Sequence, residues 1–238
     1  MPAGETTDST PRRPAPRTQR GIRTRDALVV AAREVFERDG FLDAKISDIA
    51  RTAGAASGSF YTYFDSKDEI FAAVVERVQE EMVHPHVREH SGVDDPRILI
   101  DLANREYLQR YEHNARLMAV LEQVSQIDER FRAIRLGRSM AFAERNARLI
   151  RKLQEQGKAD SDVDPEIGSL ALSAMMSRMA YLVYVYGHDI PFERLVTNLN
   201  RLWYNALNLR APTEPPTQTV DEILAGAPGE ERIELRNT

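Results

Sequence analysis

Hydroxyl-bearing side chains are concentrated in residues 57–63, beside two phenylalanines. Phe60 and Phe64 are four positions apart, so a helix here turns both rings to the same side. The opposite side then presents small or hydroxylated residues: Gly58, Ser59, Tyr61, Thr62 and Tyr63. Serine and threonine can hydrogen-bond base edges in a major groove, and tyrosine hydroxyls can reach phosphates. The pattern predicts recognition of a double helix; the alternative is a small helical core with two exposed tyrosines.

The segment just before this one has the spacing of a second short helix. Ile46, Ile49, Ala50 and Ala53 fall at i, i+3, i+4 and i+7, which is an apolar stripe for a core. Gly54 follows and can supply a tight turn. Two short helices joined by a glycine-containing turn are typical of a helix-turn-helix.

The run from Ala44 to Lys67 resembles the TetR family of one-component transcriptional regulators, whose hallmark is D-I-A-x-x-A-G-V-S-x-G-x-x-Y-x-Y-F-x-x-K. The residues in register are Asp48, Ile49, Ala50, Ala53, Gly54, Gly58, Tyr61, Tyr63, Phe64 and Lys67. The resemblance covers residues 22–75. It implies a DNA-binding surface, which we assign to Lys45, Ser57, Gly58, Ser59, Tyr61, Thr62, Tyr63 and Lys67.

The chain departs from this hallmark in two places. Ala55 and Ala56 replace the usual Val-Ser, so the hydroxyl that would cap the second helix is missing unless Ser57 takes over. Lys45 stands where the family usually has threonine, which exchanges a neutral phosphate donor for a cationic one.

The composition is that of a globular chain, with 42% hydrophobic and 29% charged residues. The absence of cysteine excludes disulfides, thiolate metal sites and cysteine nucleophiles. The amino-terminal residues are rich in proline and arginine and lack the apolar segment of a secretory signal. We expect a cytoplasmic protein without a cofactor.

The net charge of −5 conceals an uneven distribution along the chain. Residues 1–25 carry six arginines against two acids, whereas residues 211–238 carry six acids against two arginines. The amino-terminal end is therefore basic, as expected beside a DNA-binding region.

The expected fold is all-α and has four parts. Residues 1–21 are predicted to be a disordered basic arm, which either follows phosphates or only aids solubility. Residues 22–68 form the helix-turn-helix head, with a first helix capped by Thr24 and ended by Gly40. Residues 69–210 form a helical body for effector binding and dimerisation, and residues 211–238 a disordered acidic tail.

Acidic residues and prolines mark where the helices of the body begin. Helix starts are predicted at Asp95-Pro96, Asp128, Pro165 and Pro191. Residues 170–186 are apolar nearly all round but are too short for a membrane span and contain Arg178. Such a helix needs cover on more than one side. The resemblance implies that the last two helices form a dimer interface, for which we name Leu195, Leu199, Leu202 and Trp203.

A histidine run invites a metal hypothesis. His84, His86 and His90 are close in sequence, but no carboxylate pair or cysteine accompanies them. A solvated helix end, where histidine suits the negative dipole, is the simpler interpretation, and we assign no metal.

The body also contains methionines and aromatic residues that can line an adaptable apolar cavity. A plain helical core would have the same pattern, so the cavity depends on the resemblance. The residues predicted to bind ligand are Arg105, Tyr107, Met118, Glu122, Phe142, Met175, Met176, Arg178 and Met179. The expected effector is hydrophobic, either a lipid-like acid or thioester or an aromatic drug-like molecule.

The function predicted is a repressor that binds a palindromic operator as a homodimer and leaves it when an effector binds. A helical protein-binding adaptor is the alternative, and an enzyme that uses the helical body is a weaker one. No membrane association is expected.

Overall fold

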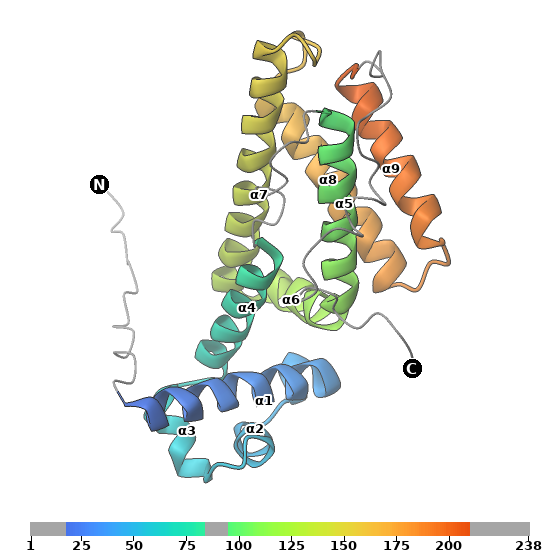
Figure 1. Ribbon diagram of the computed structural model, residues 1–238. Helices are drawn as coiled ribbons and strands as arrows, with labels where there is room; N and C mark the ends of the chain where they lie inside the picture. Colours follow the sequence, from blue (N-terminus) through green and yellow to red (C-terminus); the bar gives the residue numbers. More distant parts are fainter. Residues whose placement is uncertain (1–17, 84–94, 210–238) are drawn as a thin grey trace, which may run out of the picture. The chain divides into compact units, whose positions relative to one another are not determined.

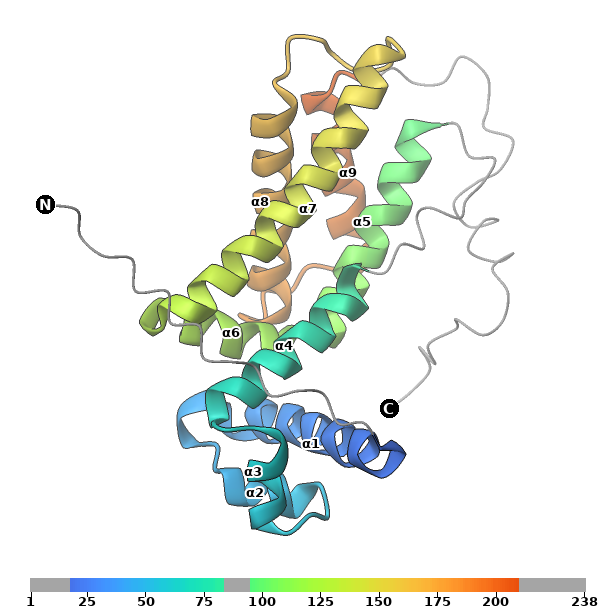
Figure 2. The ribbon, with the colours of Figure 1, turned by 90° about the vertical axis from the view of Figure 1, so that its left-hand side faces the viewer.

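The computed structural model describes residues 18–83 and 95–209, and within these ranges all regular structure is helical (Figures 1 and 2). The chain divides into two compact units, residues 1–78 and 79–238. The helices are α1 (Gln19–Asp43), α2 (Ile46–Thr52), α3 (Ser57–Tyr63), α4 (Lys67–Val83), α5 (Pro96–His113), α6 (Ala115–Ile127), α7 (Glu129–Glu155), α8 (Pro165–Tyr184) and α9 (Phe192–Ala206). The all-α fold class is confirmed.

Helix α1 begins earlier than its sequence predicts. The cap is Thr18, whose Oγ1 accepts a hydrogen bond from the Gly21 amide, and Thr24 lies inside the helix. Residues 19–21, which we assigned to the disordered arm, are therefore helical. Gly40 does interrupt the helical geometry, since its φ of 75° lies in the left-handed region, although α1 resumes as far as Asp43.

Aromatic rings form the core of the first unit. Phe36, Phe60, Phe64 and Phe71 are at most 1% exposed. The Phe36 ring lies edge-on to Phe71 at 5.0 Å between centroids, a favourable aromatic geometry. This core fixes α1 against α2 and α2 against α3.

Caps begin three helices of the second unit where the sequence predicts. Asp95, Asp128 and Asp164 each accept a backbone hydrogen bond from the first turn that follows. Helix α7 packs on α6 and α8, and α5 packs on α8 and α9. Figures 1 and 2 show α6 lying across one end of the longer helices.

Three of the four residues predicted for a dimer interface are instead buried inside the single chain, on the inner face of α9. Leu195, Leu199 and Trp203 are only 2–3% exposed within the single chain, where α9 packs against α5. The buried side chains of Asn104 and Asn200 join these helices through a 2.8 Å hydrogen bond. Of the four predicted interface residues, only Leu202 is exposed, at 51%.

Several predictions fall outside the described residues. These are the arm up to residue 17, the run containing His84, His86 and His90, and the tail of residues 211–238. Among the described helices, none is long and apolar enough to cross a membrane.

Candidate functional site

The turn between α2 and α3 depends on Gly54. Its φ is +64°, a conformation that a side chain would strain. Beside it, the amide of Ala55 donates to the carbonyl of Ala50 at 2.9 Å, so the chain leaves α2 in a closed turn. This is the glycine-containing connection of a helix-turn-helix, as the sequence predicts.

One face of α3 is buried by two rings. Phe60 is fully buried and Phe64, which follows the last residue of α3, is 1% exposed. Their centroids lie 5.8 Å apart. Both phenylalanines therefore turn inward as predicted, which fixes the side of α3 that faces away from the core.

The opposite face of α3 is open to solvent. Ser57, Gly58, Tyr61 and Thr62 are exposed, and Ser59 and Tyr63 are half-buried. Lys45, just before α2, is exposed as well. The structure thus brings the hydroxyl-bearing residues of the predicted surface onto one short helix.

The start of α3 lacks a side-chain cap. Ala56 is the N-cap and makes no side-chain hydrogen bond, while Ser57 is already the first helical residue. Ser57 therefore does not replace the missing capping hydroxyl, and it stays on the exposed surface.

Gly58 lies within α3, at a position where the described chain has room for a side chain. A Cβ built on it would meet no atom within 4 Å, and its φ is not positive. Glycine costs roughly 0.5–1 kcal/mol relative to alanine within a helix. No steric contact inside the described chain therefore requires glycine at this position.

Lys67 is the first residue of α4, and its side chain makes contacts within the head that were not predicted. Its Nζ donates to the carbonyl oxygens of Leu42 and Ala44, at 2.9 and 3.1 Å, and lies 4.8 Å from the Phe41 ring centroid. The ammonium group thus holds the segment between α1 and α2 against the start of α4. These bonds use two of the three protons of the ammonium group, and phosphate contact by Lys67 stays a prediction.

The three charged residues predicted to meet a ligand all have other surroundings. Arg105 donates to Asp101 and, through two parallel bonds, to Glu193, which raises the pKa of Arg105. Glu122 pairs with Arg135 at 2.6 Å. Arg178 is exposed and lies over the Tyr181 ring.

The aromatic part of the predicted ligand region does gather inside the body. Tyr107 lies 5.2 Å from Phe142 and 5.9 Å from Tyr111, measured between ring centroids. Met118 and Met176 are buried, and Met175 and Met179 are half-buried. Burial raises the pKa of Tyr107, whose hydroxyl hydrogen-bonds the side chain of Ser177.

Arg138, which was not predicted from the sequence, also lies in this interior. Its Nη1 contacts the sulfur of Met118 at 2.7 Å, and its Nη2 contacts the sulfur of Met82 at 2.6 Å. Burial lowers the pKa of the Arg138 guanidinium. The electrostatic effect of Tyr107 and Tyr111 partly offsets this decrease. Spacing could have identified it, because Arg138 lies seven residues after Phe131 and four before Phe142, on the inner stripe of α7.

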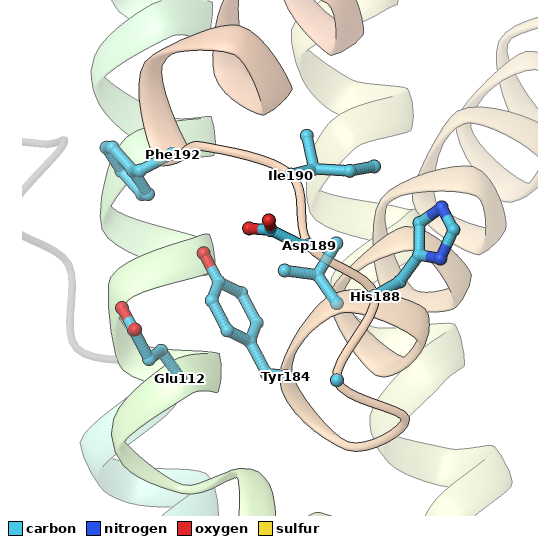
Figure 3. Close-up of a pocket in the computed structure, with 8 residues that line it drawn as sticks. Glu112, Tyr184, His188, Asp189, Ile190 and Phe192 are labelled. Atoms are coloured by element: carbon cyan, nitrogen blue, oxygen red, sulfur yellow. The ribbon is translucent and has the colours of Figure 1, made fainter.

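An open pocket of about 310 Å³ lies where α8 ends and the segment before α9 begins (Figure 3). Glu112, Tyr184, His188 and Asp189 supply its polar lining, and burial raises the pKa of Tyr184 to about 12. None of the residues predicted to bind ligand lines this pocket. No group of metal-binding side chains occurs among the described residues.

Comparison with known proteins identifies the head. Residues 28–74 match the family described as bacterial regulatory proteins, tetR family. The chain is 31% identical over 80 residues to the transcriptional repressor NicS of Pseudomonas putida, covering 34% of this chain and 38% of NicS. The repressor BepR of Brucella suis is 24% identical over 215 residues, which covers 81% of this chain and 95% of BepR.

Solved structures share the whole fold. SmeT, the repressor of a Stenotrophomonas maltophilia multidrug efflux pump, superimposes with a TM-score of 0.64 at 20% identity, over 82% of this chain and 96% of SmeT. The alignments with the first two curated relatives span 29% and 38% of those proteins. The helix-turn-helix region, residues 28–74, therefore matches the TetR family of transcriptional regulators, and the fold over most of the chain is like that of SmeT.

Proposed function

We propose that this chain is a repressor that binds duplex DNA through α3 and responds to a small hydrophobic effector. The observation that carries the proposal is the two-sided character of α3. Phe60 and Phe64 are buried, whereas Gly58, Tyr61 and Thr62 face solvent. A short helix of this kind can enter a major groove, where hydroxyls reach base edges and phosphates.

Glycine and charge at the same surface support this interpretation. Gly58 removes a side chain where nothing inside the described chain would meet one, so the backbone there can approach a groove closely. Lys45 adds an exposed cation at the start of α2, where it can contact a phosphate. These features favour DNA over the protein partner of an adaptor.

The operator would be palindromic if the chain dimerises, because two heads about one DNA turn apart (roughly 34 Å) read equivalent half-sites. The burial of Leu195, Leu199 and Trp203 moves the proposed interface to the exposed apolar residues of the last two helices. These are Ile167 at 68%, Leu170 at 40% and Leu202 at 51% exposed.

The effector is proposed to bind among the methionines and aromatic rings of the body. It would release DNA only through a difference in its affinity for the DNA-binding and released conformations. Repression rather than activation of transcription is proposed because NicS, BepR and SmeT are all described as repressors.

A salt titration of duplex binding tests the proposal. Duplexes selected from a random pool by the full chain should lose affinity steeply and linearly in log–log form as salt rises, because phosphate contacts release counterions. Duplex binding that is absent at moderate salt would contradict the proposal and favour a protein-binding adaptor.

A further inference from the structure

Arg138 differs from Arg105 and Arg135 of the body in what surrounds it. Arg105 and Arg135 each have a carboxylate partner, at 2.6–2.9 Å. Arg138 is part-buried on the inner stripe of α7, yet no described carboxylate pairs with it. Glu122, which is available from α6, pairs with Arg135 instead.

The thioether groups of two methionines lie where hydrogen-bond acceptors for the Arg138 guanidinium would be expected. The two terminal nitrogens of Arg138 point to the sulfurs of Met118 and Met82, and a thioether sulfur is only a weak acceptor. A guanidinium remains protonated even when shielded from water. A charged group removed from water without a strong partner is costly, so an anion in this place would be stabilised.

Described polar groups from the adjacent helices leave the charge unbalanced. Tyr107 and Tyr111 of α5 interact electrostatically with Arg138, and Arg135 adds a like charge from α7 itself. Tyr107 directs its hydroxyl to Ser177 of α8. Tyr107 and Tyr111 are neutral, and the charge of Arg135 is paired with Glu122, so none of these neighbours supplies an anion that pairs with Arg138.

We propose that Arg138 binds the carboxylate of the effector, whose apolar part contacts Tyr107 and Phe142. The inference rests on the proposed function of the body as an effector-binding unit, and it names the chemical class of that effector. The two Nη donors match the two oxygens of a carboxylate in a bidentate pair. Met82 and Met118 are unbranched and flexible, so their sulfurs can move aside for it.

The pocket in Figure 3 has the opposite charge and is not this site. Glu112 and Asp189 line it, and Asp189 projects its carboxylate toward the Tyr184 hydroxyl. A carboxylate would be repelled there. The acid would therefore prefer Arg138, where a cation lacks its anion.

The same contact offers a route to regulation. Met82 belongs to α4, the helix whose first residues lie in the DNA-binding unit. Displacing the Met82 side chain from Arg138 changes the packing of α4 within the body. An effector that binds more tightly after this change would shift the equilibrium between conformations.

Calorimetry with acids and their neutral counterparts tests the proposal on the full chain. The probes are decanoate and 2-naphthoate, each beside its alcohol, decan-1-ol and 2-naphthalenemethanol, with decyl phosphate as a second anion. At least one acid should bind more tightly than its alcohol by about tenfold or more. Arg138→Met should remove that preference and leave alcohol binding unchanged. Arg132→Met is the matched control and should retain it, because Arg132 is an exposed arginine of α7 that donates to the backbone carbonyls of Ser125 and Gln126, so its removal frees no carboxylate.

Three results would overturn the proposal: no acid preferred over its alcohol, acid binding undiminished in Arg138→Met, or decyl phosphate preferred over decanoate. Circular dichroism of each variant separates lost binding from lost folding. Duplex binding is measured separately without probe. A chain that holds no duplex but prefers acids through Arg138 would contradict the proposed repressor function alone.

Discussion

The Nζ atom of Lys67 lies 2.9 Å from the carbonyl oxygen of Leu42, across 25 positions of the chain. A second hydrogen bond reaches the carbonyl of Ala44, and the nearby ring of Phe41 contributes a cation–π contact. The residue that a family motif associates with DNA thus also joins two segments of the head. Its side chain therefore contributes to the packing of this unit.

Lys67→Met should lower the free energy of unfolding of the full chain by about 1–2 kcal/mol, because a charge-assisted hydrogen bond is lost at a half-buried position. Urea denaturation followed by circular dichroism measures this change. Lys45→Met is the matched control, because Lys45 is exposed and the same charge is removed. Equal stability of the two variants would show that the contacts of Lys67 contribute nothing.

Arg138→Met should raise the free energy of unfolding by about 1–2 kcal/mol, because an apolar side chain replaces a part-buried cation without a carboxylate. Arg105→Met should have the opposite sign, since it leaves Asp101 and Glu193 without their partner. Chemical denaturation of both variants provides the comparison. Destabilisation by Arg138→Met would mean that the guanidinium supports the fold.

Ile167→Lys combined with Leu202→Lys should yield monomers, because both side chains are exposed apolar groups of the last two helices. Light scattering measures the mass. Leu136→Lys, at a leucine that is 59% exposed on α7, is the control and should leave the mass of the wild type unchanged. A double variant that keeps the wild-type dimer mass would remove these residues from the interface.

The stability of the body should fall as pH rises from about 10 toward 12, the range between the ordinary pKa of tyrosine and the raised pKa of Tyr184. In this range the folded chain keeps the Tyr184 proton while the unfolded chain releases it, so alkali favours unfolding. Tyr184→Phe should make the loss smaller. Urea midpoints at pH 8 and pH 10.5 measure it, and an identical loss in both proteins would contradict the assignment.

The helix-turn-helix could be predicted from sequence because its determinants are local. The stripe of α2, the turn at Gly54 and the pair Phe60 and Phe64 all act within about 20 residues. The start of α1 was missed for a related reason. Thr18 and Thr24 offer the same capping hydroxyl, and local sequence does not show which one the folded chain uses.

The partners of apolar stripes could not be predicted in the same way. Leu195, Leu199 and Trp203 form a stripe that must be buried, but periodicity does not say whether the same chain or a second one buries it. Here α5 supplies the cover. Periodicity also does not say which face of a largely apolar helix stays exposed. Arg178 lies on such an exposed face of α8.

Arg138 was missed because Phe142 was the one residue of α7 that was predicted from the sequence to bind ligand. Its position relative to Phe131 and Phe142 was visible in the sequence. What the sequence did not contain was the pairing of Glu122 with Arg135, which leaves Arg138 without a described acid. That choice depends on how α6 packs against α7.

The central claim is that the exposed face of α3 meets duplex DNA, and Gly58 tests it with a change of one methyl group. Gly137 of α7 is the matched control, because it too is helical and exposed and has no atom within 4 Å of a built Cβ. Gly58→Ala and Gly137→Ala should each keep or raise stability, by up to about 1 kcal/mol.

The most direct measurement is the dissociation constant of the selected duplex for these two variants, obtained by fluorescence anisotropy at one fixed salt concentration. The Gly58→Ala protein should bind at least about tenfold more weakly than the wild type, since the methyl group occupies space that the groove needs, and the Gly137→Ala protein should bind as the wild type does. Equal affinities for all three proteins would contradict the assignment of α3 to DNA.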